Sequence, residues 1–418
     1  MTTPSEATSA RRQLLPFAAL SASYFAHIGF FNPYLPLWLK ALGLDLFTIS
    51  VLTSLQAFTR LFAPYGWGWL SDHTGERVKL LRYSATVALV AACGLWINGS
   101  TTVLMVVLLI MFTHTSSMMP MSEAAMAHLV SQNGIFNARR YGRVRLFGSV
   151  GFLVTVGAAG AWFEHHGMGD FPAWTVLTML AVTVSVWCLP DLKEAVPAGL
   201  EKVAMLPILR QKAVRWFLAS AFFHVLAHVA IYVFFSLYLD ALGYAKSTIG
   251  LLWAVSVVVE IAWFFTQARW LPLMSLPAWL VLCAGAMVLR MGITATGAAW
   301  IGWLVAAQLL HALTFATHHT ACIALLSHYF PGRLRGRGQA LYVVVAYGLP
   351  GVLGGVAGGA LSVRLGLGAV YWAAVVASVL ATACAITVWR LRDDAPLLPL
   401  PLPLPLPLAA SPGTPPLA

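Results

Sequence analysis

Long apolar runs alternate with short polar breaks along the chain from residue 14 to residue 390. Each run approaches or exceeds the roughly 20 residues that one helix needs to cross a hydrocarbon layer about 30 Å thick. The pattern therefore predicts twelve membrane-spanning helices joined by short connections. The expected helices are 14–41, 47–70, 80–98, 102–129, 146–165, 172–189, 215–240, 247–268, 275–294, 298–328, 338–363 and 367–390.

The longest polar break divides these helices into two sets of six. It covers 190–214 and links an N-terminal six-helix bundle, 14–189, to a C-terminal one, 215–390. The polar segment 1–13 precedes the first helix, which is too long for a signal-peptide core and lacks an evident cleavage site. After the last helix, 391–418 alternates Pro and Leu, which predicts an extended low-complexity tail. The predicted fold class is an all-α polytopic membrane protein.

The positions of the basic residues support this count of helices. Most of the 25 Lys and Arg residues fall in breaks on one side of the predicted membrane. The exceptions are Lys40, Lys246 and Arg364 on the other side, and Arg60 and Arg290 inside helices. Because excess Lys and Arg marks cytoplasmic loops, we expect both ends of the chain in the cytoplasm and the protein in the inner membrane.

Composition narrows the classes of function. Only 9% of the 418 residues are charged and the mean hydropathy is +0.80, which excludes a soluble protein. In a membrane protein the net charge of +11 reflects cytoplasmic loops, so it does not indicate binding to nucleic acid. The expected partners are the lipid bilayer and a small-molecule substrate. We expect the protein to be a monomer. The five cysteines show no CxxC spacing, and His224 and His228 lack a third ligand, so no metal or cofactor is expected. The absence of a nucleophile and base constellation argues against an enzyme.

A few ionisable residues inside the predicted helices are the main candidates for function, because charge within a bilayer is costly. They are Glu123, Arg145, Glu260, Arg290 and His311. Acidic and basic groups on different helices could neutralise each other across the bundle or change protonation when a substrate arrives. The alternative is that they are buried pairs that only fix the register of the helices.

Other residues are weaker candidates. Arg60, in the second helix, either contributes to function or braces that helix. Tyr34 and Trp263 are among the aromatic residues near the ionisable positions that could stack on a substrate ring, and simple packing is the alternative for each.

The segment GWLSDHTGERVKLL, at 68–81, resembles the signature loop of the major facilitator superfamily. In that loop Gly68, Asp72, Gly75 and Arg77 would form the gating turn, with Asp72 pairing with basic groups and Gly75 allowing the turn. A weaker counterpart, PGRLRGRGQAL, stands at 331–341.

Across nearly the whole chain the sequence is similar to the lactose-permease-like branch of that superfamily, and most of all to its 3-phenylpropionate permease type. The similarity rests on HIGFFNPYLPLWL at 27–39, YGRVRLFGSVGF at 141–152 and RGRGQALYVVVAYGLPG at 335–351.

The resemblance also suggests roles for the ionisable residues. Glu123 and Arg145 match a sugar-binding acid and its arginine, and Glu260, Arg290 and His311 match the acid, arginine and histidine that couple substrate to proton. On this basis we expect Glu260 to pair with Arg290, with more certainty than Glu123 with Arg145. This chain departs from the branch at Thr314, which stands where lactose permease has its proton-carrying glutamate. The resemblance therefore implies that Glu260 carries the proton.

The implied function is proton-coupled uptake of a small organic solute, such as an aromatic carboxylate, by alternating access between two halves. Three other functions stay open at this point. They are symport of an oligosaccharide or glycoside, export of small hydrophobic compounds, and a non-transporting receptor or sensor built on the same fold. The lack of a sizeable soluble domain argues against the receptor.

Overall fold

The computed structural model describes residues 4–97, 99–132, 135–136, 138–191, 205–331 and 334–391. Within these ranges twelve helical spans are long and apolar enough to cross a membrane, as predicted. Their ends lie within a few residues of the expected ones. The linker centre at 192–204 and the tail beyond 391 fall outside the described residues.

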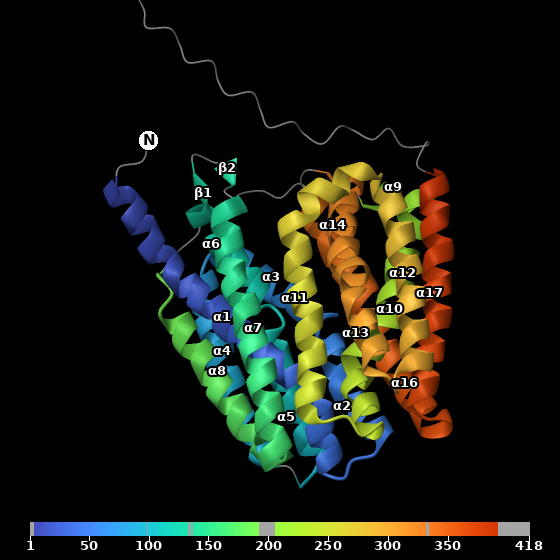
Figure 1. Cartoon of the computed structure of the whole chain (residues 1–418). Coiled ribbons are helices and arrows are strands. Elements are labelled where there is room, and N and C mark those ends of the chain that lie inside the picture. Colours follow the sequence, from blue (N-terminus) through green and yellow to red (C-terminus); the bar gives the residue numbers. More distant parts are fainter. Residues whose placement is uncertain are drawn as a thin grey trace, which may run out of the picture.

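The first six spans form one half of the molecule, coloured blue to green in Figure 1. Their elements are α1 (Pro4–Ala41), α2 (Leu46–Thr59) continued by α3 (Ala63–Thr74), α4 (Arg77–Cys93) with the turn η1 (Gly94–Trp96), α5 (Thr101–Thr115) continued by α6 (Met118–Val130), α7 (Ala138–His166), and η2 (Met168–Asp170) with α8 (Phe171–Trp187). A short hairpin, β1 (Ser131–Gln132) and β2 (Ile135–Phe136), joins α6 to α7.

The other six spans form the second half. After the short α9 (Leu206–Leu209) come α10 (Lys212–Ala241), α11 (Lys246–Trp270) with η3 (Leu271–Leu273), α12 (Leu276–Gly297), α13 (Ile301–Leu309) with η4 (Ala312–Thr317) and α14 (His318–Tyr329), α15 (Arg335–Tyr342) with η6 (Val343–Gly348) and α16 (Leu349–Leu365), and α17 (Leu367–Arg390).

Two features differ from the expected helices. The first helix begins at Pro4, so most of the polar segment 1–13 continues α1 instead of forming a separate element. Some spans are also interrupted near their middle. In the second span a turn at 60–62, just before Pro64, separates α2 from α3. In two later spans the segments η4 and η6 are π-helical. Proline disfavours helical geometry in the residue before it, while π-helical turns often mark functional positions.

The two halves meet most extensively along two helix pairs, α2 with α16 and α7 with α11, and less extensively between α1 and α10. Glycines allow the close approach of α2 and α16. A Cβ atom added to Gly355 or Gly359 would overlap the hydroxyl of Ser54 or Ser50 on the facing helix. Small residues at a membrane helix interface let backbones pack closely where lipid offers no hydrophobic drive for association.

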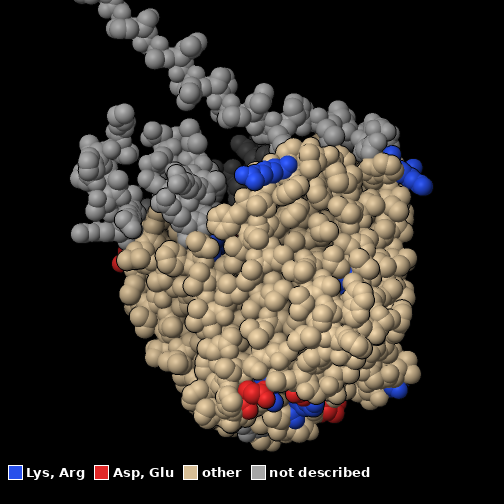
Figure 2. Space-filling model, viewed as in Figure 1, with Lys and Arg blue, Asp and Glu red and all other residues tan. Residues whose placement is uncertain are grey.

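The molecule has two polar ends. We call the end that carries the start of α1 and the end of α17 the terminal face, and the opposite end the distal face (Figure 1). Figure 2 shows charged side chains gathered at these two ends, with a band between them that is almost free of charge. The expectation that both ends of the chain lie on one side agrees with this arrangement; which side of the membrane that is remains a proposal.

Polar contacts join the two halves at the distal face. Lys40 on α1 pairs with Asp240 on α10 at 2.7 Å. The carboxylate of Glu164, at the end of α7, accepts a hydrogen bond at 2.5 Å from the backbone N–H of Lys246, which begins α11. A carboxylate at a helix N-terminus accepts from a backbone N–H that has no partner within the helix, and it interacts favourably with the positive end of the helix dipole. The halves are therefore closed against each other at this face.

Tyr34 belongs to the same closure. Its hydroxyl donates to the carbonyl oxygens of Val156 on α7 at 3.1 Å and of Lys246 on α11 at 3.2 Å, and its side chain is fully buried. Gly160 and Gly250 pack against that hydroxyl without room for a Cβ. The structure thus gives Tyr34 a position between helices of both halves, and not the substrate-stacking position expected from the sequence.

The packing of α1 on α7 yields a stability prediction. A Cβ atom on Gly151 of α7 would collide with the backbone of Ala22 on α1, whereas one on Gly157 of the same helix would meet nothing within 4 Å. We expect Gly151→Ala to destabilise the fold by about 1–3 kcal/mol, as overpacking does. Gly157→Ala, the control, should be neutral or stabilising, because Ala favours helix over Gly by about 1 kcal/mol. Thermal unfolding in detergent compares them; equal melting temperatures would contradict the packing argument.

Candidate functional site

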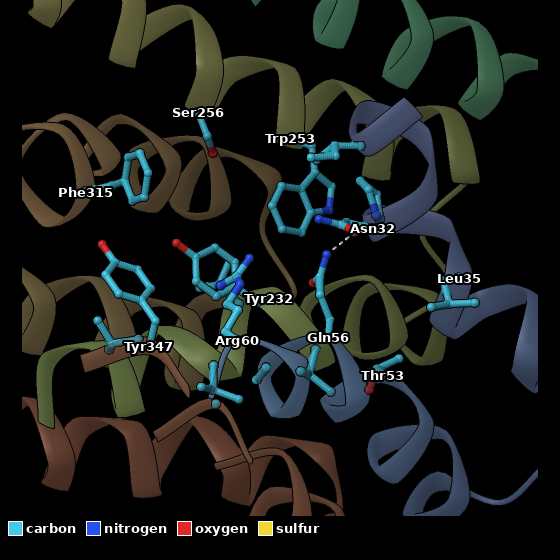
Figure 3. Close-up of a pocket in the computed structure, with 18 of the residues that line it drawn as sticks. Asn32, Leu35, Thr53, Gln56, Arg60, Tyr232, Trp253, Ser256, Phe315 and Tyr347 are labelled. Carbon is cyan, nitrogen blue, oxygen red and sulfur yellow. Dashed lines mark hydrogen bonds between the residues drawn. The ribbon is translucent and has the colours of Figure 1, made fainter. Parts of the chain in front are cut away.

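A cavity of about 520 Å³ lies between the two halves. Aromatic residues form much of its wall, and Figure 3 shows several of them around the open space; they are Phe25, Phe112, Phe152, Tyr232, Trp253, Phe315 and Tyr347. Its ionisable and amide-bearing residues are Asn32, Gln56, Arg60, Glu260, Arg290, His311 and His319. This volume, and a mostly apolar wall with a few polar groups, are typical of a site for a small organic molecule.

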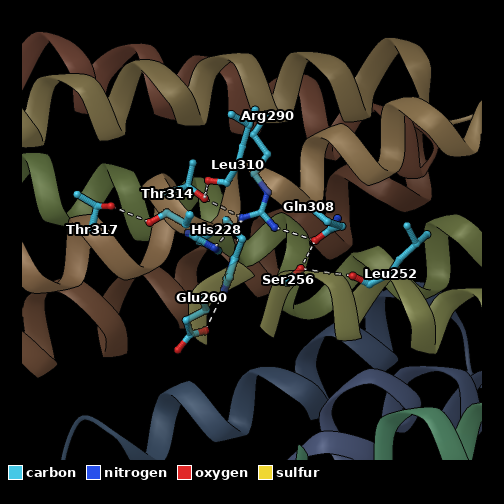
Figure 4. Close-up of polar contacts among 11 residues, drawn as sticks. His228, Leu252, Ser256, Glu260, Arg290, Gln308, Leu310, Thr314 and Thr317 are labelled. Carbon is cyan, nitrogen blue, oxygen red and sulfur yellow. Dashed lines mark hydrogen bonds and ion pairs between the residues drawn. The ribbon is translucent and has the colours of Figure 1, made fainter. Parts of the chain in front are cut away.

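Arg290 on α12 is the most deeply buried charge of the site, with no exposed surface. Its Nη1 donates to Thr314 Oγ1 at 2.9 Å and lies 3.2 Å from His311 Nδ1. The same atom lies 3.3 Å from His228 Nε2, while Nη2 donates to Gln308 Oε1 at 3.0 Å (Figure 4). Among the described residues no carboxylate lies within ion-pair distance of this guanidinium. Two histidines, one threonine and one glutamine surround it instead.

The π-helical segment η4 positions two of these partners. His311 directly precedes it, and Thr314 lies within it. The wider turn is closed by the Thr317 hydroxyl, which donates to the carbonyl of Ala312 five residues earlier at 2.8 Å. The carbonyl of Thr314 in turn accepts from His224 Nε2 at 2.7 Å. Thr314 stands where the resemblance predicts an acid, and its hydroxyl instead accepts a hydrogen bond from Arg290.

Glu260 on α11 lines the cavity beside this cluster. Its Oε2 lies 3.3 Å from His311 Nε2, and its side chain is about 23% exposed. The three residues predicted to act together are therefore brought together, with His311 between the other two. The direct pair of Glu260 with Arg290 expected from the sequence does not form, because the imidazole of His311 occupies the space between them.

Three members of the cluster are not predicted by the sequence. Its pattern marks His228 only as a possible metal ligand and does not single out Gln308 or Ser256. Ser256 donates to Gln308 Oε1, the oxygen that also accepts from Arg290. The spacing of Gln308, three residues before His311 in a predicted helix, was a signal that both share a face.

Glu123 and Arg145 form the second pair expected from the resemblance. Arg145 Nη1, on α7, lies 2.9 Å from Glu123 Oε1, on α6, and its guanidinium sits 5.0 Å above the ring of Phe25. Phe25 lines the cavity, while the pair lies behind it. The role of Glu123 and Arg145 as substrate ligands stays a prediction.

Trp263 lies on α11 away from the residues that line the cavity. It packs edge-on against Trp279 of α12, with the ring centroids 6.0 Å apart, and its indole N–H is buried without a partner among the described residues. This placement favours packing, the alternative that the sequence left open.

The signature loop connects α3 to α4 at the terminal face. Arg77 Nη2 pairs with Asp72 Oδ1 at 3.1 Å, and Arg77 Nε donates to Ser71 Oγ at 2.8 Å. Gly75 ends α3 with φ of +65°, a left-handed conformation that glycine adopts without steric cost. Gly68 lies in α3 with open space where a Cβ would stand. The loop is a compact turn held by its own ion pair.

Histidines are numerous around the cluster, but they do not form a metal centre. His224 stacks on His318 with centroids 3.6 Å apart and rings nearly parallel, an arrangement that points no nitrogens at a common centre. Within the described part of the chain, no group of three or more His, Cys, Asp or Glu residues is placed to hold a metal ion.

The chain is similar in sequence to known membrane proteins. The sequence profile of the MFS_1 like family matches residues 19–387. The chain is 28% identical over 334 residues to a probable 3-phenylpropionic acid transporter of Escherichia coli strain K12, which covers 78% of this chain and 85% of that protein. It is 23% identical over 325 residues to the maltose permease of Geobacillus stearothermophilus, which covers 77% of this chain and 81% of that one.

Solved structures share the fold. A mutant of the nucleoside transporter NupG superposes with a TM-score of 0.79 at 15% identity, covering 90% of this chain and 99% of that one. A bacterial homologue of the human lysosomal transporter Spinster, in an inward-facing and unoccupied conformation, gives a TM-score of 0.70 at 12% identity, with 94% and 99% covered. At these identities the likeness concerns the arrangement of helices alone.

The Arg290 cluster predicts the effect of a nearly isosteric substitution. Thr314→Val removes one acceptor from a buried guanidinium, which we expect to destabilise the protein by about 1–3 kcal/mol. The control is Thr296→Val on α12, where the exposed hydroxyl bonds only the carbonyl of Gly292 in its own helix. Thermal unfolding of the two variants in detergent measures the difference. If Thr314→Val unfolds at the same temperature as Thr296→Val, Thr314 does not support Arg290.

Proposed function

This chain belongs to the MFS_1 like family of membrane transporters, and on that premise we propose that it couples proton entry to the uptake of a small aromatic carboxylate. It is a secondary transporter of the major facilitator type, a multi-pass membrane protein with a small-molecule substrate, and not an enzyme. We also propose that it works as a monomer. The coupling ion in this proposal is the proton, and no other cofactor is involved.

The charges of the residues that line the cavity are the main observation in favour of an anionic substrate. Two arginines, Arg60 and Arg290, face a single carboxylate, Glu260, among the described lining residues. With neutral histidines the site has one excess positive charge, and its walls are largely aromatic. A monovalent anion with an aromatic ring complements both features. The similarity to a probable 3-phenylpropionic acid transporter supports the same class of substrate.

Glu260 is the proposed proton carrier. It is the one carboxylate among the described lining residues, it is partly exposed to the cavity, and His311 contacts it. Protonation of Glu260 would remove the negative charge that competes with an anionic substrate for the arginines. Proton and substrate would therefore favour each other's binding, which is the requirement for symport.

The orientation in the membrane is part of the proposal. We place the terminal face, with its basic loops, in the cytoplasm of the inner membrane. The contacts of Lys40 with Asp240 and of Glu164 with the start of α11 then close the outer side of the cavity. Uptake requires these contacts to open when the two halves rock against each other.

A second substrate class has specific support. The side chains of Gln56 and Asn32 lie beside Trp253 in the cavity, and the Gln56 amide donates to Asn32 at 3.3 Å (Figure 3). Amides and an indole ring suit a sugar, and the chain is also similar to a maltose permease. An oligosaccharide or glycoside is therefore the second candidate. It leaves the excess positive charge of the cavity uncompensated.

The first functional prediction separates proton coupling from substrate binding. In right-side-out vesicles with an inward proton gradient, we expect labelled 3-phenylpropionate to accumulate and a labelled maltoside not to. Glu260→Gln should abolish gradient-driven accumulation and retain counterflow exchange, because the amide resembles the protonated acid. The control is Asp170→Asn, an exposed carboxylate at the distal face whose partner is the indole N–H of Trp162.

Each outcome of this experiment has a clear meaning. Intact gradient-driven uptake by Glu260→Gln would remove Glu260 from proton coupling. Accumulation of the maltoside alone would replace the aromatic carboxylate by the second candidate. Failure of both compounds to accumulate would contradict the proposed uptake itself.

The closure at the distal face predicts a reversible block. In a Lys40→Cys, Asp240→Cys double variant, the two thiols replace side chains that now touch. We expect oxidation or a short thiol cross-linker to stop uptake, because the halves can no longer separate there, and reduction to restore it after oxidation. The single-cysteine variants treated in the same way are the controls. Unchanged uptake by the cross-linked double variant would show that this face does not open during transport.

A further inference from the structure

Arg60 occupies an unusual place in the fold. It caps the C-terminal end of α2, directly after Thr59, and begins the turn at 60–62 that interrupts the second span, halfway between Leu46 and Thr74. The chain resumes as α3 with Pro64 in its first turn. An arginine at this depth is far from either polar end, so it has no route to solvent except through the cavity that it lines.

Arg60 also differs from the other arginines of the membrane region in its partners. Arg145 has a carboxylate partner, and Arg290 has four side-chain partners. The guanidinium of Arg60 makes no hydrogen bond or ion pair with any described residue. The side chain is partly exposed and lines the cavity, so its N–H donors are available to an acceptor that enters there.

The surroundings of Arg60 match one kind of acceptor. Its side chain projects among Tyr232 of α10 and Tyr347 of η6, which belong to the other half, while Gln56 lies one turn earlier on α2 (Figure 3). The planar guanidinium presents two parallel N–H donors, the geometry that a carboxylate accepts in bidentate fashion. Aromatic rings beside such a donor provide a stacking surface for the rest of an aromatic acid.

We propose that Arg60 binds the carboxylate of the substrate, and that Arg290 is a fixed charge whose Nη1 and Nη2 groups already contact side chains of its own half. This inference rests on the proposed function, because it names the group that receives the aromatic carboxylate. It assigns the anion to the N-terminal half and the proton, on Glu260, to the C-terminal half. Substrate and proton then bind on opposite walls of one cavity.

The assignment has a consequence for the net charge of the site. The empty cavity carries two arginines and one ionised glutamate, and the loaded cavity adds one anion and one proton. Its net charge is the same in both states. Transport of the monovalent acid with one proton is therefore electroneutral.

Binding to the purified full-length protein in detergent tests the proposal. The probes are 3-phenylpropionate and its neutral amide, 3-phenylpropanamide. Each is titrated by calorimetry into wild type, Arg60→Gln and Arg60→Lys. The control is Arg269→Gln, which alters an exposed arginine on α11. We expect Arg60→Gln to bind the carboxylate about 10- to 100-fold more weakly, which is the usual effect of losing a hydrogen bond to a charged group. The amide should bind wild type and Arg60→Gln alike, and Arg269→Gln should match wild type for both.

The outcomes separate this inference from the proposed function. Wild type that binds no 3-phenylpropionate overturns the proposed function and, with it, the inference. Wild type that binds the carboxylate while folded Arg60→Gln binds it equally well overturns the inference alone. If Arg60→Gln does not fold, as judged by its melting temperature and gel filtration, Arg60→Lys decides. Selective weakening of carboxylate binding in Arg60→Lys supports the assignment, and unchanged carboxylate affinity overturns it.

Discussion

A single buried guanidinium fixes the arrangement of the C-terminal half. Arg290 has no exposed surface, so its donors depend on acceptors from the chain itself; Nη1 and Nη2 have them, while Nε has none among the described residues. The acceptors come from three different segments, with His228 on α10, Gln308 on α13 and Thr314 on η4. Moving any of these segments would leave a charge without partners in a region that excludes water. The register of these helices around α12 therefore follows from the need to satisfy one residue.

The same cluster reaches the cavity through His311. One nitrogen of this imidazole lies next to Arg290 and the other next to Glu260. The histidine thus separates a permanently charged group from one that can gain or lose a proton. The imidazole therefore occupies the place between Glu260 and Arg290 that a direct ion pair would need. Glu260 is the one carboxylate among the described lining residues, which is the observation behind its proposed role as proton carrier.

Much of the fold could be predicted from the sequence, because a helix that crosses a bilayer must be a long apolar run. The separation into halves followed from the polar break at 190–214. The positions of individual side chains in the site were harder to predict. Tyr34 was expected in the cavity, yet the rotation of α1 directs its hydroxyl to carbonyls of α7 and α11. No periodic pattern reveals that rotation when apolar residues surround the whole helix.

The candidate site could also be predicted only in part. Charge inside apolar runs located Glu260, Arg290 and His311, and the structure brings them together. Their order in space could not be deduced, because it depends on the π-helical turn η4 and on side-chain partners such as Gln308 and His228. A regular helix was expected there, and hydrophobic patterning does not register a single extra residue in a turn.

The irregular segments of the spans share one location. The turn at 60–62 supplies Arg60 to the cavity, η4 supplies Phe315, and η6 supplies Tyr347. Irregular backbone is tolerated at membrane depth only where it is buried in protein or lines a cavity, because lipid cannot satisfy its polar groups. These interruptions are thus not defects in the predicted helices. The turn at 60–62 and η6 lie in spans that meet across the boundary between the halves, while η4 reaches the cavity within the second half. Regular helix prediction therefore fails at several of the positions that line the site, although Glu260 and Arg290 lie in regular helices.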